Sequence, residues 1–293
     1  MYEKLEVCPS CKHTAFSNFL IAEDHTVSKE SFALVKCDKC QLIFTNPRPD
    51  EVHIGKYYES DNYISHTNSG NNPINLIYKL VRKYTLRQKV NLIAKYTSGK
   101  RILDFGCGTG AYLHSLQQAN FDIAGFEPNE QAREIASNLT GIEIFHEQKQ
   151  LKNADNFHAV TAWHVIEHVH QLRDTLKLLR SKTADDGYLF IAVPNAASYD
   201  AQHYKEKWAA YDVPRHLYHF TPESFRFLAN KSKLKVVDML PMKFDSYYVS
   251  LLSEQYTHGR TKPIAAFKRG MISNQKAYKS RDYSSIIYVL QKK

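Results

Sequence analysis

The chain has 293 residues, of which 43% are hydrophobic and 24% are charged, a composition typical of a soluble globular protein and unlike that of disordered or collagen-like chains. Its 39 lysine and arginine residues outnumber its 30 acidic residues and give a formal charge of +9. Because this excess is spread along the chain, we interpret it as an aid to solubility, and a nucleic-acid partner is the less favoured alternative.

The N-terminus shows no targeting pattern. Residues 1–10 carry charges and lack the apolar core of a signal peptide, and nowhere in the chain do 18 apolar residues follow one another. We therefore expect a cytoplasmic protein without a membrane span.

Residues 1–46 form the first expected module, which is defined by two cysteine pairs. Four of the five cysteines form C-x-x-C pairs, Cys8 with Cys11 and Cys37 with Cys40. Each spacing brings two sulfur atoms to one tetrahedral metal ion, and a reducing compartment favours metal over disulfides. We predict a structural Zn²⁺ ion in a zinc ribbon; an iron site of the rubredoxin type would use the same ligands.

Residues 47–98 are expected to form a linker and a cap. After Pro47 and Pro49 the composition shifts towards Tyr, Asn, Ser and His, which is typical of a connecting segment. A helix is predicted from about Ile74 to Tyr96.

Residues 99–293 alternate between short apolar runs and helical stretches. The runs are ILDF, DIAGF, IEIF, AVTAW and YLFIAV, and strands that alternate with helices predict a parallel sheet and an α/β fold. A polar, aromatic segment at about 196–221 is interpreted as an insertion on the substrate side, because α/β proteins bind ligands at the carboxyl edge of the sheet. Thr221 and Pro222 predict the start of a helix. Residues 243–283 form a C-terminal extension, expected to be helical and irregular.

A glycine-rich loop follows the first of these strands. The segment Asp104-Phe105-Gly106-Cys107-Gly108-Thr109-Gly110 ends a buried strand in an acid and turns through three glycines into a helix. Glycine suits a backbone that a ligand approaches closely. The glycine pattern also fits a dinucleotide-binding loop, in which Glu127 would bind a ribose hydroxyl. Asp104 favours a cationic ligand without phosphate, since a carboxylate beside the loop would repel a pyrophosphate.

These residues resemble the class I S-adenosylmethionine-dependent methyltransferases, in which a D-x-G-x-G-x-G loop holds the methionine part of the cofactor and an acid after the second strand holds the ribose. The resemblance implies a Rossmann-like sheet of seven mostly parallel strands, the last antiparallel, with S-adenosylmethionine as cofactor. The runs 157–169, 187–195 and 208–221 look like the branch of this family that often carries an N-terminal zinc ribbon. The cofactor-binding residues that the resemblance implies are Asp104, Gly106, Cys107, Gly108, Gly110, Glu127, Pro128, Trp163 and His164.

The run from His164 to His168 also matches H-x-x-E-H, a zinc-peptidase pattern. That pattern requires a long helix that presents both histidines on one face, whereas here the run directly follows an apolar strand. We therefore expect Glu167 and His168 to form hydrogen bonds that close this loop.

Three histidines are candidates for proton transfer. His216 is the first candidate general base, because neutral histidine accepts a proton near pH 7 and some sugar C-methyltransferases use a histidine in a similar H-L-x-x-F-[ST] context. His164 and His219 are the other candidates. The alternative is that Arg215, His216 and His219 only brace this loop against the sheet. The expected substrate-binding residues are Tyr58, Tyr63, Trp208, Tyr211 and Arg215.

The function predicted from these features is S-adenosylmethionine-dependent methylation of a small-molecule acceptor, at oxygen or carbon rather than nitrogen. The alternatives are an RNA, DNA or protein methyltransferase, and a zinc-bearing binding protein without catalysis. The fourth strand lacks the Asn/Asp-Pro-Pro-aromatic motif of enzymes that methylate base amino groups, which disfavours an RNA or DNA methyltransferase. The intact loop acids Asp104 and Glu127 disfavour the second. The sequence carries no indication of the oligomeric state.

Overall fold

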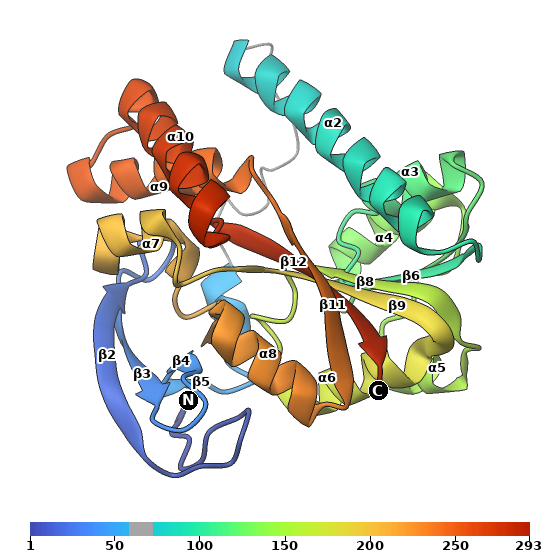
Figure 1. Ribbon diagram of the computed structural model, residues 1–293, viewed down its shortest axis with the longest axis horizontal. Coiled ribbons are helices and arrows are strands. Elements are labelled where there is room, and N and C mark those ends of the chain that lie inside the picture. The colour runs from blue at the N-terminus through green and yellow to red at the C-terminus, as the bar shows by residue number, and fades with distance from the viewer. Residues whose placement is uncertain (59–72) are drawn as a thin grey trace. The chain divides into compact units, whose positions relative to one another are not determined.

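The structure is a computed structural model that describes residues 1–58 and 73–293, and the backbone alone at 73–79. Figure 1 shows the ribbon, coloured along the chain. The chain divides into two compact units. Unit 1 comprises Met1–Ser60, His164–Thr175 and Ala192–Val289, and unit 2 comprises Asp61–Trp163, Leu176–Ile191 and Leu290–Lys293. The boundaries expected at residues 46 and 98 stay predictions.

Unit 2 contains the alternating strands and helices that the apolar runs predict. Strand β6 (Arg101–Phe105) pairs in parallel with β7 (Asp122–Phe126) on one side and β8 (Phe157–Trp163) on the other. Ile102 and Leu103 of β6 are fully buried, as expected of a strand covered on both faces. The helices of this unit are α2 (Pro73–Tyr96), α3 (Ala111–Gln118), α4 (Glu130–Thr140), α5 (Gln148–Asn153) and most of α6 (Leu172–Lys182).

The central sheet has the strand order β11–β12–β9–β8–β6–β7, in which the remaining strands are β9 (Thr183–Pro194), β11 (Leu234–Pro241) and β12 (Ser285–Lys292). The predicted α/β fold with a mostly parallel sheet is confirmed. The described part of this sheet has six strands instead of the expected seven. The run IEIF forms only one isolated parallel bridge, Phe126 with Phe145, because the N-cap of α5 follows two residues later at Glu147.

Unit 1 contains a second sheet, with the order β10–β4–β3–β2. Strands β2 (Phe16–Glu23), β3 (Ser31–Cys37) and β4 (Ile43–Thr45) come from the N-terminal module. Strand β10 (Tyr218–His219) comes from the expected insertion, and its Tyr218 pairs antiparallel with Phe44. A separate two-stranded sheet joins β1 (Tyr2–Glu3) to β5 (Arg48–Pro49). The N-terminal module is therefore completed by a strand from much later in the chain.

The helices of unit 1 come from the expected linker, from the insertion and the residues that follow it, and from the C-terminal extension. They are the 3₁₀ helices η1 (Ile54–Tyr58), η2 (Lys205–Lys207) and η3 (Ala209–Tyr211), and the α-helices α7 (Tyr199–Tyr204), α8 (Pro222–Lys231), α9 (Asp245–His258) and α10 (Pro263–Ser280). The prediction for α8 is confirmed, since Thr221 accepts from the Ser224 N–H as N-cap and Pro222 occupies the first turn. The extension forms two regular helices, α9 and α10.

A buried carboxylate connects these helices to one another. Asp200 of α7 accepts hydrogen bonds from Trp208 Nε1 at 2.9 Å, Ser273 Oγ at 2.7 Å and Ser284 Oγ at 2.7 Å. Its oxygens are satisfied although the residue is 1% exposed. The insertion, α10 and the segment before β12 are thus held by one residue.

The core of unit 1 combines the N-terminal module with the insertion. Phe32, Leu34 and Ile43 of the ribbon sheet belong to the same buried cluster as Trp208 and Tyr211 of the insertion. Both segments bury apolar surface against each other, so neither completes a core alone. In the part of the chain that the structure describes, no helix is both long and apolar enough to span a bilayer.

Candidate functional site

The glycine loop of unit 2 connects β6 to α3 through backbone conformations that favour glycine. Gly106, Gly108 and Gly110 have φ angles of 77°, 54° and 78°. A Cβ atom at Gly110 would lie 2.9 Å from the Ala136 Cβ of α4, so this glycine permits close packing of helix against loop. At Gly108, no atom of the described residues beyond its chain neighbours lies within 4 Å of such a Cβ atom. The backbone at Gly108 therefore borders open space, where a ligand can approach it.

Asp104 lies at the end of β6 beneath this loop. It is 3% exposed, and its Oδ1 accepts a 2.6 Å hydrogen bond from Thr161 Oγ1 of β8. Burial raises the pKa of Asp104 to about 6, although the Thr161 hydrogen bond and the positive charge of Lys89 oppose this. At neutral pH the carboxylate is thus ionised but poorly solvated, and a further cation nearby would stabilise it.

Glu127 lies beyond the end of β7 and closes the other side of the loop. Its Oε2 accepts from the Gly108 N–H and its Oε1 from the Asn129 N–H, both at 2.9 Å. Burial raises the pKa of Glu127, and these two hydrogen bonds counteract the rise. Each carboxylate oxygen can accept a second hydrogen bond, so Glu127 can still bind a hydroxyl group.

An aromatic pair and a lysine complete this region of unit 2. Trp163, the last residue of β8, packs edge-on against Tyr112 of α3 with ring centroids 5.6 Å apart. The Lys89 ammonium of α2 lies 4.3 Å from the centroid of a Trp163 ring. A cation is therefore already favoured beside Asp104, by the carboxylate and by the aromatic face. The sequence interpretation missed Lys89 and Tyr112, because nothing in the local pattern of α2 or α3 points to the loop.

Cys107 and Pro128 lie on the loop and after β7, as predicted. Cys107 is 8% exposed and packs with Leu113 and Ile144 in a small apolar cluster. Burial raises the pKa of its thiol far above the ordinary value, so the thiol stays protonated. This is consistent with a small loop residue rather than a nucleophile.

His164, the first residue of unit 1 after Trp163, lies between two carboxylates. Its Nδ1 is 3.3 Å from Glu167 Oε1 and its Nε2 is 3.1 Å from Asp245 Oδ2 of α9. Burial lowers the pKa of His164, but Asp245 and Glu167 outweigh it and raise the pKa to about 9. His164 is therefore an imidazolium cation at neutral pH. Asp245 was not identified from the sequence, since it lies far along the chain in the unassigned extension.

His168 and His216 lie side by side, with ring centroids 4.6 Å apart. His168 Nδ1 is 3.0 Å from the Arg215 carbonyl oxygen and 3.0 Å from Tyr58 Oη. His216 Nδ1 is 2.9 Å from the Ala210 carbonyl oxygen. Because a carbonyl only accepts hydrogen bonds, both Nδ1 atoms carry the proton and both Nε2 atoms carry the lone pair in the neutral rings.

His219 lies in β10 and is almost fully buried, with 3% exposure. Its Nε2 is 3.3 Å from Thr45 Oγ1 of β4. Burial and the neighbouring His216 lower the pKa of His219 far below its ordinary value. His219 is thus a neutral residue inside the ribbon sheet.

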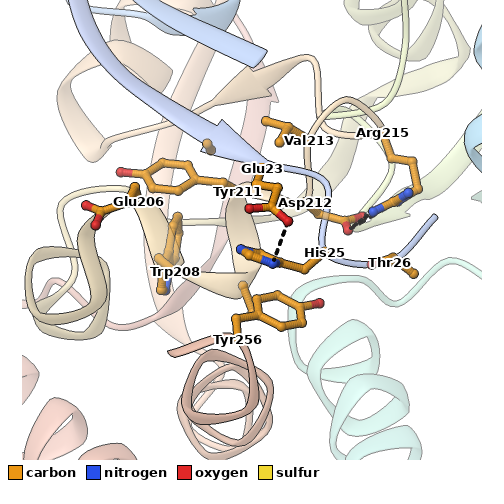
Figure 2. Close-up of a pocket in the computed structure, with 12 residues that line it drawn as sticks. Glu23, His25, Thr26, Glu206, Trp208, Tyr211, Asp212, Val213, Arg215 and Tyr256 are labelled. Carbon is orange, nitrogen blue, oxygen red and sulfur yellow. Dashed lines mark hydrogen bonds and ion pairs between the residues drawn. The ribbon is translucent and has the colours of Figure 1, made fainter. Parts of the chain in front are cut away.

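The other residues predicted to bind substrate have internal partners. Arg215 is 1% exposed and donates to Asp24, to Asp212 and to the Tyr57 carbonyl oxygen. Trp208 and Tyr211 are buried and pack edge-on at 4.9 Å. Figure 2 shows these residues around a small cavity of about 10 Å³, which is room for one water molecule. The predicted residue Tyr63 lies outside the described residues.

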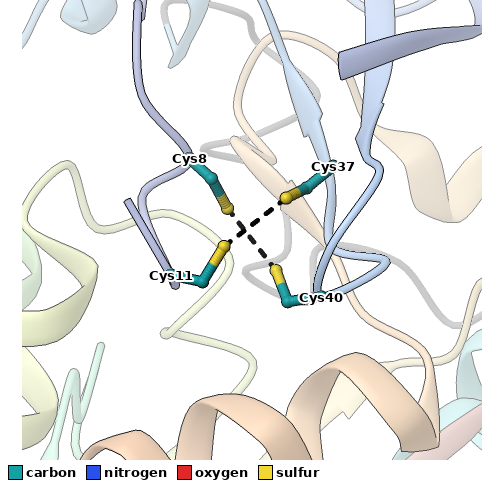
Figure 3. A group of neighbouring side chains, drawn as sticks. All are labelled: Cys8, Cys11, Cys37 and Cys40. Atoms are coloured by element: carbon teal, nitrogen blue, oxygen red, sulfur yellow. Dashed lines mark hydrogen bonds between the residues drawn. The ribbon is translucent and has the colours of Figure 1, made fainter. Parts of the chain in front are cut away.

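The four cysteines of the ribbon converge on one point (Figure 3). The sulfur atoms of Cys8 and Cys40 are 3.5 Å apart, as are those of Cys11 and Cys37. These distances are too long for disulfides, in which sulfur atoms are about 2.05 Å apart. They are close to the separation of about 3.8 Å that four sulfurs adopt at Zn–S bonds of about 2.3 Å in a tetrahedron. The predicted four-cysteine cluster is confirmed, and its geometry fits a tetrahedral metal ion.

The comparison with known proteins agrees with this geometry. A profile of a protein family described as a methyltransferase domain matches residues 78–238. The chain belongs to this methyltransferase family. The matched region of the methyltransferase includes the glycine loop, both loop acids and His216.

Two relatives show what this methyltransferase resembles in sequence. It is 25% identical over 158 residues to a ubiquinone biosynthesis O-methyltransferase of Haemophilus ducreyi, a match that covers 50% of this chain and 65% of that protein. It is 31% identical over 134 residues to the protein of the same name in Vibrio parahaemolyticus, covering 42% of this chain and 54% of that protein. The chain thus spans less than two thirds of the length of these relatives.

A solved structure shows the shared fold. The magnesium protoporphyrin IX methyltransferase of Synechocystis, with bound S-adenosylhomocysteine, superposes with a TM-score of 0.55 at 14% identity. The match covers 83% of this chain and 100% of that chain.

Proposed function

We propose that this methyltransferase transfers the methyl group of S-adenosylmethionine to a hydroxyl oxygen of a small organic molecule. The observation that carries the proposal is a glycine loop that is open at Gly108 and flanked by the buried carboxylates of Asp104 and Glu127. Two carboxylates disfavour a pyrophosphate and favour a cationic nucleoside. The names of the relatives support oxygen as the methylated atom and a quinone-type ring as the acceptor.

The residues of the loop region fit the cofactor. Asp104 would hold the ammonium group of its methionine part, and the Lys89 ammonium over Trp163 indicates that a cation is stable there. Glu127 would bind the ribose hydroxyls with its remaining lone pairs. When bound, S-adenosylmethionine supplies an electrophilic methyl group on a sulfonium, so alignment by the protein accounts for most of the catalysis. The further residues proposed to contact it are Gly106, Cys107, Gly110, Pro128, Trp163 and His164.

His216 is the proposed proton acceptor for a hydroxyl that reacts as its anion. Its Nε2 lone pair is supported by the hydrogen bond of Nδ1 to Ala210. His164 is already protonated at neutral pH, and His219 is buried against Thr45. Tyr58 is proposed to contact the molecule that receives the methyl group. A structural role is proposed for Arg215, Trp208 and Tyr211, because their buried contacts hold the insertion in place.

We propose that the four-cysteine cluster holds a structural Zn²⁺ ion. Its four thiolates leave no open coordination position, which supports a role in folding rather than in methyl transfer. The ribbon strands it joins also contribute to the core of unit 1.

Cofactor binding is tested by calorimetric titration with S-adenosylhomocysteine. We expect the wild-type protein to bind it, Asp104→Asn to bind at least tenfold more weakly, and the exposed control Asp122→Asn of β7 to match the wild type. Comparable binding of NADH by the wild type would contradict the proposal. Transfer of a labelled methyl group to a panel of catechols and hydroxyquinones then tests the acceptor, and labelling only of amines or nucleic acid would overturn O-methylation.

A further inference from the structure

Three side chains of unit 1 outside the ribbon converge in the arrangement of a metal site. We name Glu167, His168 and His216 the Glu–His–His cluster. Each offers a ligand atom, and these atoms lie within 4.8 Å of one another. Glu167 is fully buried, His216 is 9% exposed and His168 is half-buried. The cluster is separate from the four cysteines, with which it shares no residue.

The two histidines are oriented as metal ligands usually are. Their Nδ1–H groups donate to the backbone carbonyl oxygens of Arg215 and Ala210, at 3.0 Å and 2.9 Å. Such a hydrogen bond fixes the ring and the tautomer, and directs the Nε2 lone pair to a metal ion. In the neutral ring the proton on Nδ1 leaves the Nε2 lone pair of His168 free to coordinate.

The carboxylate of the cluster has an unsatisfied oxygen. Glu167 Oε1 is paired with His164 at 3.3 Å, whereas Oε2 is buried and has no hydrogen-bond partner among the described residues. The contact between Oε1 and the His164 ring favours the ionised form of the Glu167 carboxylate. A buried anionic oxygen without a donor destabilises the folded state unless a cation meets it.

Two groups of ion pairs border the cluster. His164 pairs with Glu167 and with Asp245, and Arg215 pairs with Asp24 and with Asp212. Buried charges such as the Glu167 carboxylate are stable only when they are paired.

We propose that the Glu–His–His cluster binds one divalent transition-metal ion through Glu167 Oε2, His168 Nε2 and His216 Nε2. Two imidazoles and one carboxylate suit Zn²⁺, Fe²⁺ or Mn²⁺. The Asp212 Oδ2 atom, 3.9 Å from His216 Nε2, is the nearest further oxygen donor. Three protein ligands leave at least one coordination position open for water or a ligand.

The proposed ion does not depend on the identity of the methyl acceptor. One consequence does rest on the proposed function: the lone pair of His216 binds either the ion or a proton. In the metal-loaded protein, a hydroxyl bound at the open position would become more acidic and lose its proton to solvent water, because a divalent cation lowers the pKa of its ligands.

The inference is tested by counting metal ions in the full-length protein. After dialysis against Zn²⁺ we expect two zinc ions per chain by elemental analysis, one in each cluster. Glu167→Gln and His216→Gln should each retain one ion, and the exposed controls Glu147→Gln and His146→Gln should retain two. Mn²⁺ is then titrated into protein that holds zinc only in the four-cysteine cluster, and electron paramagnetic resonance follows the free ion. The wild type should take up Mn²⁺, and the cluster variants should take up none.

The outcomes separate the alternatives. One zinc ion per chain in the wild type overturns the proposal and leaves the cluster as a hydrogen-bonded brace. A second ion that persists in the double variant Glu167→Gln/His216→Gln also overturns it, because that ion must bind elsewhere. Circular dichroism checks that the variants fold, and the wild-type stoichiometry decides the question if they do not. Since metal content is measured without substrate, this result is independent of cofactor binding and methyl transfer.

Discussion

The glycine loop of unit 2 and the histidine-bearing segments of unit 1 bring their functional groups together in different ways. Asp104 and the three loop glycines are contiguous in sequence, and Glu127 joins them through the Gly108 N–H. His168 and His216 belong to separate segments, and Arg215 connects them to Asp24 of the ribbon. The first site depends on local backbone conformation, whereas the second depends on buried ion pairs and on the ribbon that supplies them.

The largest expected effect is the removal of metal from the four-cysteine cluster. Chelation, or Cys37→Ser, should abolish the stabilisation of roughly 10 kcal/mol that such sites contribute in small zinc modules. Hydrogen exchange followed by mass spectrometry should then show loss of protection in β2, β3, β4 and β10, while β6 and β7 of unit 2 stay protected. Equal loss of protection in β6 would show that unit 2 depends on the metal as much as unit 1 does. Cys107→Ser, which changes a cysteine outside the cluster, is the matched control.

Arg215→Ala should give the second largest effect. It leaves the buried carboxylate of Asp24 without its guanidinium partner at 3.0 Å. Removing one member of a buried ion pair typically costs about 3–5 kcal/mol. Urea unfolding should show this loss, whereas Arg173→Ala on the exposed side of α6 should change the free energy of unfolding by less than about 0.5 kcal/mol. A small change in the free energy of unfolding for Arg215→Ala would mean that water solvates the Asp24 carboxylate in place of the guanidinium.

The sequence predicted well the features that neighbouring residues form, and poorly the contacts between residues that are distant in sequence. The loop, its two acids and the start of α8 follow from local patterns of glycine, charge and capping residues. The cysteine cluster follows from two short spacings. The protonation of His164 could not be predicted, because it depends on Asp245, which is distant in sequence. The position of Lys89 over Trp163 is set by how α2 packs, and the sequence of α2 alone gives no sign of that contact.

The pH dependence of the free energy of unfolding should reveal the ion pairs that His164 forms in unit 1. The folded-state pKa of His164 is raised to about 9, above the unfolded value of about 6.5. The stabilisation is therefore fully present below about pH 6.5 and is lost as the pH rises through about 9. We expect a loss of up to about 2 kcal/mol over this window, since a partly exposed ring is screened by solvent. His164→Gln should flatten the profile measured by urea unfolding at each pH, and the exposed control His146→Gln should leave it unchanged.

The smallest effect on stability is expected for Gly108→Ala. Its φ of 54° strains alanine by roughly 1–2 kcal/mol, but no neighbouring atom obstructs the added carbon. Gly141→Ala is a matched control, because Gly141 also has a positive φ, of 71°, and open space around it. Both variants should lose similar stability, and only Gly108→Ala should weaken S-adenosylhomocysteine binding. Equal binding by the two variants would show that no ligand passes close to Gly108.

The pairing of β10 with β4 has a consequence for how this protein matures. The ribbon sheet acquires its last strand only after the ribosome has made residue 219, so an N-terminal fragment that has bound its metal still exposes the edge of β4. The same two-residue strand carries His219 and begins two residues after His216. The two-residue strand and the ribbon therefore depend on each other: neither the edge of β4 nor the histidine segment is covered until both parts of the chain have been made.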